Sequence, residues 1–257
     1  MFIAKIAFII VAIGFCTGGT IRNYRMEGGT DAAEGQFPFQ VSIQFCILGF
    51  CEHACGGVII DKNWILTSAA CIGDAQKVVV GQTNLHDNRT LVDVEKTFAH
   101  EGFDEDTGIS PNDIGLLKLA EPLTFNDTVN VAKLPQQGQT FNGTATLSGY
   151  GYSLLPEFNK LQYVSDLNIT TFEKCKSAID AIVSDGDPLD EKSNLCTLNE
   201  EANNCDGDAG GPLSQDGVVI GIVTWYFDPC NIKGAPNVYT NVANFVDWIN
   251  GTISKNQ

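Results

Sequence analysis

The cysteines are the feature that most constrains how this chain folds. Nine cysteines occur in 257 residues, and one of them, Cys16, lies in an apolar N-terminal leader. An even number, eight, remains, which is typical of a chain that folds with disulfides in an oxidising compartment. No compact spacing of cysteine and histidine predicts a zinc site, so we expect disulfides and neither a metal nor another cofactor. The eight are Cys46, Cys51, Cys55, Cys71, Cys175, Cys196, Cys205 and Cys230.

The N-terminal leader has the pattern of a secretory signal peptide. Lys5 supplies a positive charge, an apolar run extends from Ile6 to Phe15, and small residues follow it. The run is too short to span a bilayer, which argues against the alternative of a membrane anchor. We therefore expect a secreted, extracellular protein. Its expected divisions are a signal peptide at residues 1–18, a short pro-segment at 19–25 and a folded domain at 26–257.

The charge of the chain argues against two classes of partner. Basic side chains number 15 and acidic ones 31, a net charge of −16. Three of the basic residues (Lys5, Arg22 and Arg25) and no acidic one lie in the first 25 residues, so the remaining chain carries −19. Such a field repels the phosphates of nucleic acids and of anionic membranes. We expect neither a nucleic acid nor a membrane as partner.

The hydrophobic pattern predicts many short strands and one terminal helix. Residues 39–44 alternate between apolar and polar side chains, and similar short runs occur at 64–67, 77–80, 114–119 and 218–225, separated by turn-forming residues. Such spacing is typical of a β-barrel or β-sandwich. Near the C-terminus, apolar residues recur at spacings of three and four, as on one face of a helix. They are Val242, Phe245, Val246, Ile249 and Ile253.

Sequons for N-linked glycosylation occur five times. Each is a short pattern that often arises by chance, so their use is a hypothesis that a mass shift on deglycosylation tests. The candidate residues are Asn88, Asn126, Asn142, Asn168 and Asn250.

Three segments together resemble the chymotrypsin-type serine proteases. They are Cys55-Gly-Gly-Val-Ile-Ile with Trp64-Ile-Leu-Thr-Ser-Ala-Ala-Cys71, then Asn112-Asp-Ile-Gly-Leu-Leu-Lys-Leu, then Cys205-Asp-Gly-Asp-Ala-Gly-Gly-Pro212 with Gly221-Ile-Val-Thr-Trp225 and Pro236-Asn-Val-Tyr-Thr. They follow the family's order over nearly all of residues 26–257. The resemblance implies an all-β fold of two packed six-stranded antiparallel barrels with a C-terminal helix. The barrels are expected at about 26–135 and 136–257.

The resemblance also implies a disulfide pairing. Three bridges carry over from the family, which leaves Cys46 and Cys51 to close a small hairpin or to remain as two free thiols. The second alternative is unusual in a secreted protein. The implied bridges are Cys55–Cys71, Cys175–Cys196 and Cys205–Cys230.

The family's catalytic chemistry lacks two of its groups in this sequence. Peptide hydrolysis on this scaffold uses a serine nucleophile, a histidine base, an aspartate that orients the histidine and two backbone N–H donors for the oxyanion. The resemblance places Ala70 at the histidine position and Ala209 at the serine position, and it retains the aspartate as Asp113. The N–H groups of Gly207 and Ala209 remain as oxyanion donors. The sequence therefore predicts an inactive serine endopeptidase homologue.

Few other residues are candidates to restore the reaction. The chain has three histidines, of which His53 matches a structural histidine of the family and His86 and His100 fall in segments that resemble surface loops. Ser68 is near Ala70 in sequence but needs a base. We therefore expect no rescue of catalysis.

The family's substrate pocket is also changed. Its base corresponds to Asn203, which lacks the acid that trypsin-like members use to bind Lys or Arg. Two wall positions that often hold glycine are Tyr226 and Asn237, which we expect to obstruct the pocket. In the alternative, Tyr226 swings outward and leaves a shallow groove. These changes go beyond the catalytic positions, so we interpret the chain as a natural inactive paralogue rather than an engineered knockout.

One activation device of the family is retained in the sequence. In the family, cleavage after a basic residue frees an amine that pairs with the aspartate before the serine. Arg25, Met26 and Asp208 stand at the corresponding positions. We expect cleavage after Arg25 to give a Met26 amine that pairs with Asp208, because a buried aspartate without a partner is costly.

The sequence thus favours a secreted, non-catalytic serine protease homologue (a pseudoprotease) that binds another protein. The chain is similar to arthropod digestive and allergen-type proteases, and the resemblance implies roles in modulating a proteolytic, defence or complement cascade. Two alternatives remain. One is a weak residual hydrolase that uses the oxyanion hole and a water, and the other is a bulk component or allergen of gut, saliva or venom.

Overall fold

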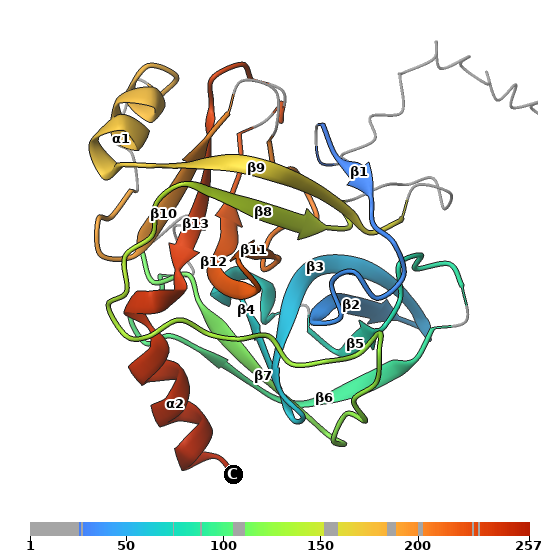
Figure 1. The fold of residues 1–257 in the computed structure, drawn as a ribbon. Coiled ribbons are helices and arrows are strands. Elements are labelled where there is room, and N and C mark those ends of the chain that lie inside the picture. The colour runs from blue at the N-terminus through green and yellow to red at the C-terminus, as the bar shows by residue number, and fades with distance from the viewer. Residues whose placement is uncertain are drawn as a thin grey trace, which may run out of the picture.

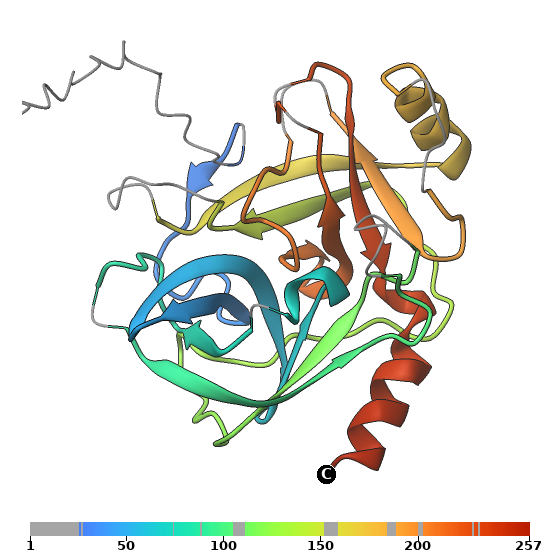
Figure 2. The same cartoon turned by 180° about the vertical axis from the view of Figure 1, so that it is seen from behind.

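Two antiparallel β-barrels packed side by side make up the protein (Figure 1 and, from behind, Figure 2). This confirms the expected fold class, including the C-terminal helix. The computed structural model describes residues 26, 28–73, 75–87, 89–104, 111–151, 159–183, 189–199, 203–227, 229–230 and 232–257.

The first barrel closes in the order β2-β3-β4-β7-β6-β5. The alternation at residues 39–44 separates two buried faces of β2: Val41 and Ile43 point into the barrel core, whereas Gln40 bonds Ser148 of the second barrel. The polar side of this strand is therefore buried against hydrogen-bonding groups rather than in water. The strands are β2 (Gln40–Ile47), β3 (Phe50–Asp61), β4 (Trp64–Thr67), β5 (Lys77–Val80), β6 (Leu91–Ala99) and β7 (Gly115–Leu119).

The second barrel closes through β8 to β13, since β8 pairs with both β9 and β11. The short strand β1 (Thr30–Asp31) pairs with β9, and the buried Met26 side chain joins this barrel's core. The N-terminal segment thus packs on the second barrel, although it precedes the strands of the first barrel in sequence. The strands are β8 (Thr144–Gly149), β9 (Gln162–Thr170), β10 (Asn194–Leu198), β11 (Pro212–Gln215), β12 (Val218–Trp225) and β13 (Pro236–Asn241).

Helices are few and short. The expected terminal helix is α2 (Val246–Lys255), preceded by the 3-10 turn η3 (Val242–Asn244). A second helix, α1 (Phe172–Asp180), was not predicted from the sequence, although Thr171 caps it by accepting a hydrogen bond from the Lys174 N–H. A 3-10 turn, η1 (Ala69–Cys71), follows β4. Within the described residues, no helix has both the length and the hydropathy needed to cross a membrane.

The core continues from one barrel into the other. One cluster joins Leu66 of β4 and Leu116 of β7 to Ile222 of β12 and to Phe245 and Ile249 at the terminal helix. Burial of this apolar surface fixes the barrels against each other and holds the segments at their junction in place.

All four expected disulfides are present. The bridges are Cys46–Cys51, Cys55–Cys71, Cys175–Cys196 and Cys205–Cys230.

Candidate functional site

Asp113 is the centre of a buried polar cluster between the barrels. Its Oδ1 accepts a hydrogen bond from the Ala70 N–H at 2.9 Å, and its Oδ2 accepts one from the Thr224 hydroxyl at 2.5 Å. The Thr240 hydroxyl donates to its backbone carbonyl at 2.6 Å. Burial raises the pKa of the carboxyl, and the bonds from Thr224 and Ala70 oppose that rise. Asp113 is thus held in one orientation by groups from both barrels.

The residue that Asp113 faces is an alanine. Ala70 lies in η1 and is exposed, so it presents only a methyl group and a backbone N–H beside the carboxylate. The structure therefore places positions 70 and 113 together, as the resemblance requires. The Thr224 contact was missed from the sequence, although Thr224 lies within the quoted segment before Trp225.

Ala209 is held at the junction by strand β3. Its carbonyl accepts a hydrogen bond from the Gly56 N–H at 2.7 Å, and the Gly56 carbonyl accepts one from the Thr67 hydroxyl at 2.9 Å. The next residue, Gly210, has φ +77°, and a Cβ there would lie 2.1 Å from the Thr67 Oγ1. Only glycine fits at position 210, because any side chain there would clash with Thr67. The close contact between Gly210 and Thr67 brings the segment that contains Ala209 against the end of β4, which leads to Ala70.

The segment before Ala209 turns at Gly207, one of the two residues that the resemblance assigns as oxyanion donors. Gly207 has φ +84°, and its carbonyl accepts a hydrogen bond from the His53 Nε2 at 2.9 Å. The other ring nitrogen of His53 bonds the Ser42 hydroxyl at 2.6 Å. Burial lowers the pKa of His53 to about 4, so the ring is neutral at neutral pH and ties β3 to the Gly207 turn.

A family comparison identifies this arrangement. A family model described as Trypsin matches residues 26–249, nearly the whole described chain. The chain belongs to the trypsin family of serine proteases. Curated relatives include Kallikrein 1-related peptidase b16 of Mus musculus, 33% identical with 98% of each chain covered. Trypsin-1 of Astacus astacus is 34% identical, with 86% of this chain and 97% of the relative covered. Trypsin I-P1 of Gallus gallus is 31% identical over 99% of both.

Asp208, the acidic member of the expected activation pair of this trypsin-family chain, is fully buried. Its Oδ1 accepts a hydrogen bond from the Gly151 N–H and its Oδ2 one from the Cys205 N–H, each at 3.0 Å. Burial raises the pKa of the carboxyl to about 7, more than these two bonds lower it. The Met26 side chain lies close by: a Cβ built on Gly149 would be 2.2 Å from the Asp208 Oδ1 and 3.5 Å from the Met26 Cε.

Asn203, which the resemblance assigns to the base of the substrate pocket, is buried, and its side chain is only partly hydrogen-bonded. The Asn203 side-chain nitrogen donates to the Ile232 carbonyl at 3.5 Å. Its side-chain oxygen is buried and has no hydrogen-bond partner among the described residues. The Asn237 oxygen accepts a bond from the Asn204 N–H at 2.7 Å, and its nitrogen donates to the Thr197 hydroxyl at 3.4 Å. The Asn237 side chain is therefore bonded to the backbone and side chains that flank the pocket base.

Tyr226 follows the last residue of β12. It is half-buried, and the preceding Trp225 packs edge-on against Phe227, with ring centroids 5.4 Å apart. Of the three positions that the resemblance assigns to the pocket, Asn203 and Asn237 are buried, and the N–H of Asn204, next to Asn203 in the chain, bonds the Asn237 side chain. Tyr226 is more exposed than either.

The groups considered as substitutes for the missing catalytic residues are occupied elsewhere. The Ser68 hydroxyl is buried and donates to the Cys71 sulfur at 3.0 Å. His86 contacts the Asn159 amide at 3.1 Å. His100 packs against the rings of Phe245 and Trp248 at the terminal helix.

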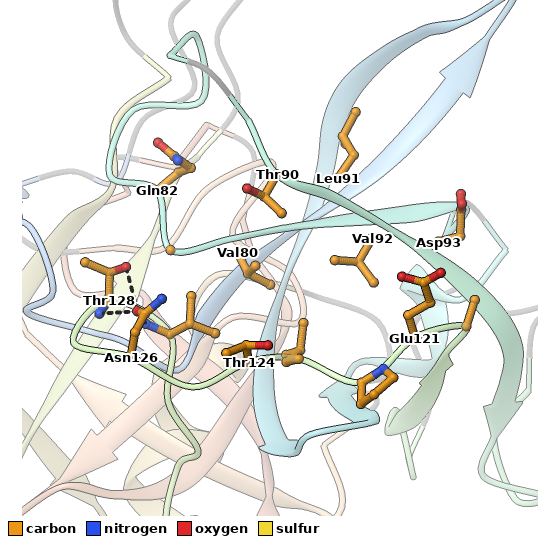
Figure 3. Close-up of a pocket in the computed structure, with 15 residues that line it drawn as sticks. Val80, Gln82, Thr90, Leu91, Val92, Asp93, Glu121, Thr124, Asn126 and Thr128 are labelled. Carbon is orange, nitrogen blue, oxygen red and sulfur yellow. Dashed lines mark hydrogen bonds between the residues drawn. The ribbon is translucent and has the colours of Figure 1, made fainter.

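A separate cavity of about 540 Å³ lies in the first barrel (Figure 3). It is lined by β5, by β6 and by residues 120–129, and it includes the sequon residue Asn126. The Asn126 side-chain oxygen accepts bonds from the Thr128 N–H at 2.8 Å and the Thr128 hydroxyl at 3.0 Å, as Figure 3 shows. The other described sequon residues, Asn142, Asn168 and Asn250, are also exposed, while Asn88 lies outside the described residues, as do residues 1–25.

Proposed function

We propose that this chain is a secreted, non-catalytic member of the trypsin family that acts by binding another protein. The observation that carries the proposal is the alanine at both position 70 and position 209, beside an Asp113 that keeps its buried contacts. A methyl group neither attacks a carbonyl nor accepts a proton, so the nucleophile and the base are both missing.

The contacts of the remaining candidates support the same proposal. Ser68 and His53 are buried, and their polar atoms bond the Cys71 sulfur, the Ser42 hydroxyl and the Gly207 carbonyl. A group that replaced the nucleophile or base would have to leave these bonds and expose an unsatisfied partner.

Secretion is supported by the leader and the disulfides together. Lys5 and the apolar run that follows it match a signal peptide, and four disulfides form among the eight cysteines after the leader. Disulfides persist in oxidising compartments and are rare in the cytosol.

Glycosylation belongs to this proposal, and Asn126 is its best-placed site. The bonds from Thr128 fix the side-chain oxygen of the amide, and the residue is exposed in a loop. Asn126→Asp keeps an oxygen acceptor for those bonds and removes the nitrogen that carries a glycan. We expect the intact mass of the secreted protein to fall by one glycan in this variant, and an unchanged mass would exclude the site.

The binding role follows from what the scaffold retains without catalysis. A rigid, bridged body that presents loops is a common platform for recognition. Asn237 fills a wall position with a bonded amide where a glycine would leave space, so we expect partner contacts outside the family's substrate pocket.

Turnover by the protein cleaved after Arg25 tests the central claim. A broad peptide library is incubated with the parent and with the double variant Ala70→His, Ala209→Ser. We expect no turnover by the parent above a control lacking protein. An active double variant would show that the pocket still admits a peptide, and a silent one would place a second block there. Turnover by repurified parent would overturn the proposal.

Cleavage after Arg25 is tested on the same material. We propose that the freed Met26 amine pairs with Asp208, whose two hydrogen-bond partners among the described residues are both neutral N–H groups. Such a pair would lower the pKa of Asp208 from about 7. N-terminal sequencing of the secreted protein should begin at Met26, and an earlier start would contradict the proposal.

A further inference from the structure

The hairpin between β2 and β3 carries an apolar surface that the fold does not use. Eight large apolar side chains are exposed among the described residues, and four of these eight fall in one stretch of six residues at this hairpin. We call them the apolar tip: Phe45, Ile47, Leu48 and Phe50, which are 37%, 58%, 94% and 78% exposed. Single exposed apolar residues are ordinary, but a cluster of this kind marks an interaction surface.

The apolar tip is held rigid. The β-ladder continues to the end of the hairpin, where Cys46 pairs with Cys51 and Ile47 with Phe50. The Cys46–Cys51 disulfide crosses the hairpin just below the tip. The guanidinium of Arg89 donates to the Cys51 carbonyl at 3.1 Å. A surface fixed in this way loses little conformational freedom on binding.

Leu48 adds a strained backbone to this surface. It has φ +52° and Gly49 has φ +86°, so the two residues form a tight turn in which asparagine or glycine is favoured at the first position. A leucine in the left-handed region is unfavourable. Because the Leu48 side chain is 94% exposed, packing against the described residues does not offset that cost.

We propose that the apolar tip is the element with which this chain docks, by insertion into an apolar pocket of a different protein whose rim is basic. This inference rests on the proposed binding function and names the surface that performs it. A convex hairpin that ends in Leu48 and Phe50 fits a concave apolar pocket, the geometry in which a few buried side chains supply most of the affinity.

Charge selects the class of partner. Within residues 45–52 the only charged side chain is Glu52, and the one cation described beside the tip, Arg89, is bonded to the Cys51 carbonyl and the Gln44 side chain. The chain as a whole carries a net charge of −16. A second copy would bring like charges together, and an anionic membrane would be repelled. A basic protein surface is attracted by the same field, which increases its rate of encounter with the tip.

Strand β3 connects the tip to the site described above. Phe50 begins the strand, His53 bonds the Gly207 carbonyl and Gly56 bonds the Ala209 carbonyl. At about 3.3 Å per residue, the tip begins about 10 Å from His53. A partner seated on the tip therefore lies close to the strand that joins the Gly207–Ala209 segment.

Photo-crosslinking identifies the partner. A benzophenone-bearing amino acid replaces Leu48 in one variant and Val183, an exposed apolar residue beyond α1, in a control. Each is irradiated in the secretion from which the protein comes. We expect a protein crosslinked through position 48 and not through 183, and the parent in excess should compete for it.

The purified partner then measures the contribution of the tip. Leu48→Asn suits the turn better than leucine, so we expect an unchanged or higher melting temperature with affinity reduced at least tenfold. Phe50→Ser should weaken binding similarly, and Val183→Ser should leave it unchanged. If Leu48 served only the fold, affinity would follow stability, and Leu48→Asn would bind the partner at least as tightly as the parent does.

Each other outcome overturns the inference in an identifiable way. Equal affinity of parent and Leu48→Asn for a purified partner would exclude the tip but leave the binding function standing. Dimerisation in sedimentation, or adsorption to phosphatidylcholine vesicles, that depends on Leu48 would assign the tip to another occupant. No competable crosslink from position 48 would also exclude the tip. Peptide turnover by the parent would refute the proposed function itself, whatever the tip binds.

Discussion

Two parts of the β2–β3 hairpin differ in how far the fold accounts for their residues. The inner end is His53 and Gly56 in the middle of β3, and the outer end is Leu48 in the turn and Phe50 at the start of β3. At the inner end, His53 and Gly56 are packed between the barrels, and each bonds a carbonyl of the segment that leads to Ala209. At the outer end, Leu48 and Phe50 are exposed and bond no side chain among the described residues, although the turn that carries them is strained. Folding accounts for the inner end, and the docking proposed above would account for the outer end.

This difference teaches how to separate structural from functional residues on one element. Changing a residue that folding requires lowers the stability of the protein. Changing a residue that only binding requires lowers the affinity for the partner and leaves the stability the same or higher. The following changes test which description applies to each end.

Acid should loosen the inner end through His53. Burial lowers its pKa from 6.5 to about 4, so between these values the unfolded chain binds a proton that the folded chain excludes. The contribution of His53 to the free energy of unfolding is therefore complete above pH about 6.5. It falls by on the order of 3 kcal/mol as the pH drops towards 4.

Asp208 has to be removed from this measurement because its sign is opposite. Its pKa is raised to about 7, so its contribution falls as pH rises from about 4 to about 7. Burial also raises the pKa of Asp113, which is present in both variants, so the effect of His53 is measured as a difference. In denaturant unfolding, the stability of Asp208→Asn minus that of the same protein with His53→Gln should rise over pH 4–6.5, and parallel curves for the two variants would contradict the prediction.

Adding one methyl group at each end should have unequal effects. A Cβ at Gly56 would lie 2.7 Å from the Gly211 Cα, a backbone atom, so Gly56→Ala should cost up to about 3 kcal/mol. Gly49 has φ +86° with nothing within 4 Å of a Cβ, so Gly49→Ala should cost only the left-handed backbone, about 1 kcal/mol. Equal shifts in urea midpoint would mean that the outer end is as tightly constrained as the inner one.

Removing the hairpin disulfide should loosen the outer end alone. Cys46 and Cys51 are five residues apart, and closing so short a loop contributes about 2 kcal/mol. Cys46→Ala with Cys51→Ala should lower the melting temperature by about 4–8 °C. Amide exchange should accelerate at Ile47 and Phe50 and stay unchanged at Gly56. Acceleration at Gly56 would show that the two ends unfold together.

The smallest expected effect is a gain. Leu48→Asn relieves the left-handed leucine and should raise the free energy of unfolding by about 1 kcal/mol. A loss of stability in calorimetry would show that Leu48 contributes to the fold and that the two ends are alike.

Much of the architecture and the site was predictable from residues that have one physical use. The cysteine count predicted a bridged chain, and the spacing of Val242, Phe245 and Ile249 predicted a buried helix face. The quoted motifs assigned positions 70, 113 and 209 before any geometry was known. Helix α1 was missed because nine residues with only Cys175 and Ile179 buried give a weak periodic signal.

The sequence by itself determined which chemical groups are present, and the tertiary structure decided what each group contacts. The absence of an imidazole at position 70 and of a hydroxyl at 209 is a property of the chain. The pKa of about 4 at His53 and the exposure of Leu48 are not, because burial and hydrogen-bond partners come from segments far away in sequence. His53 and Gly207 are 154 residues apart, and only the packing of two barrels brings them within a hydrogen bond.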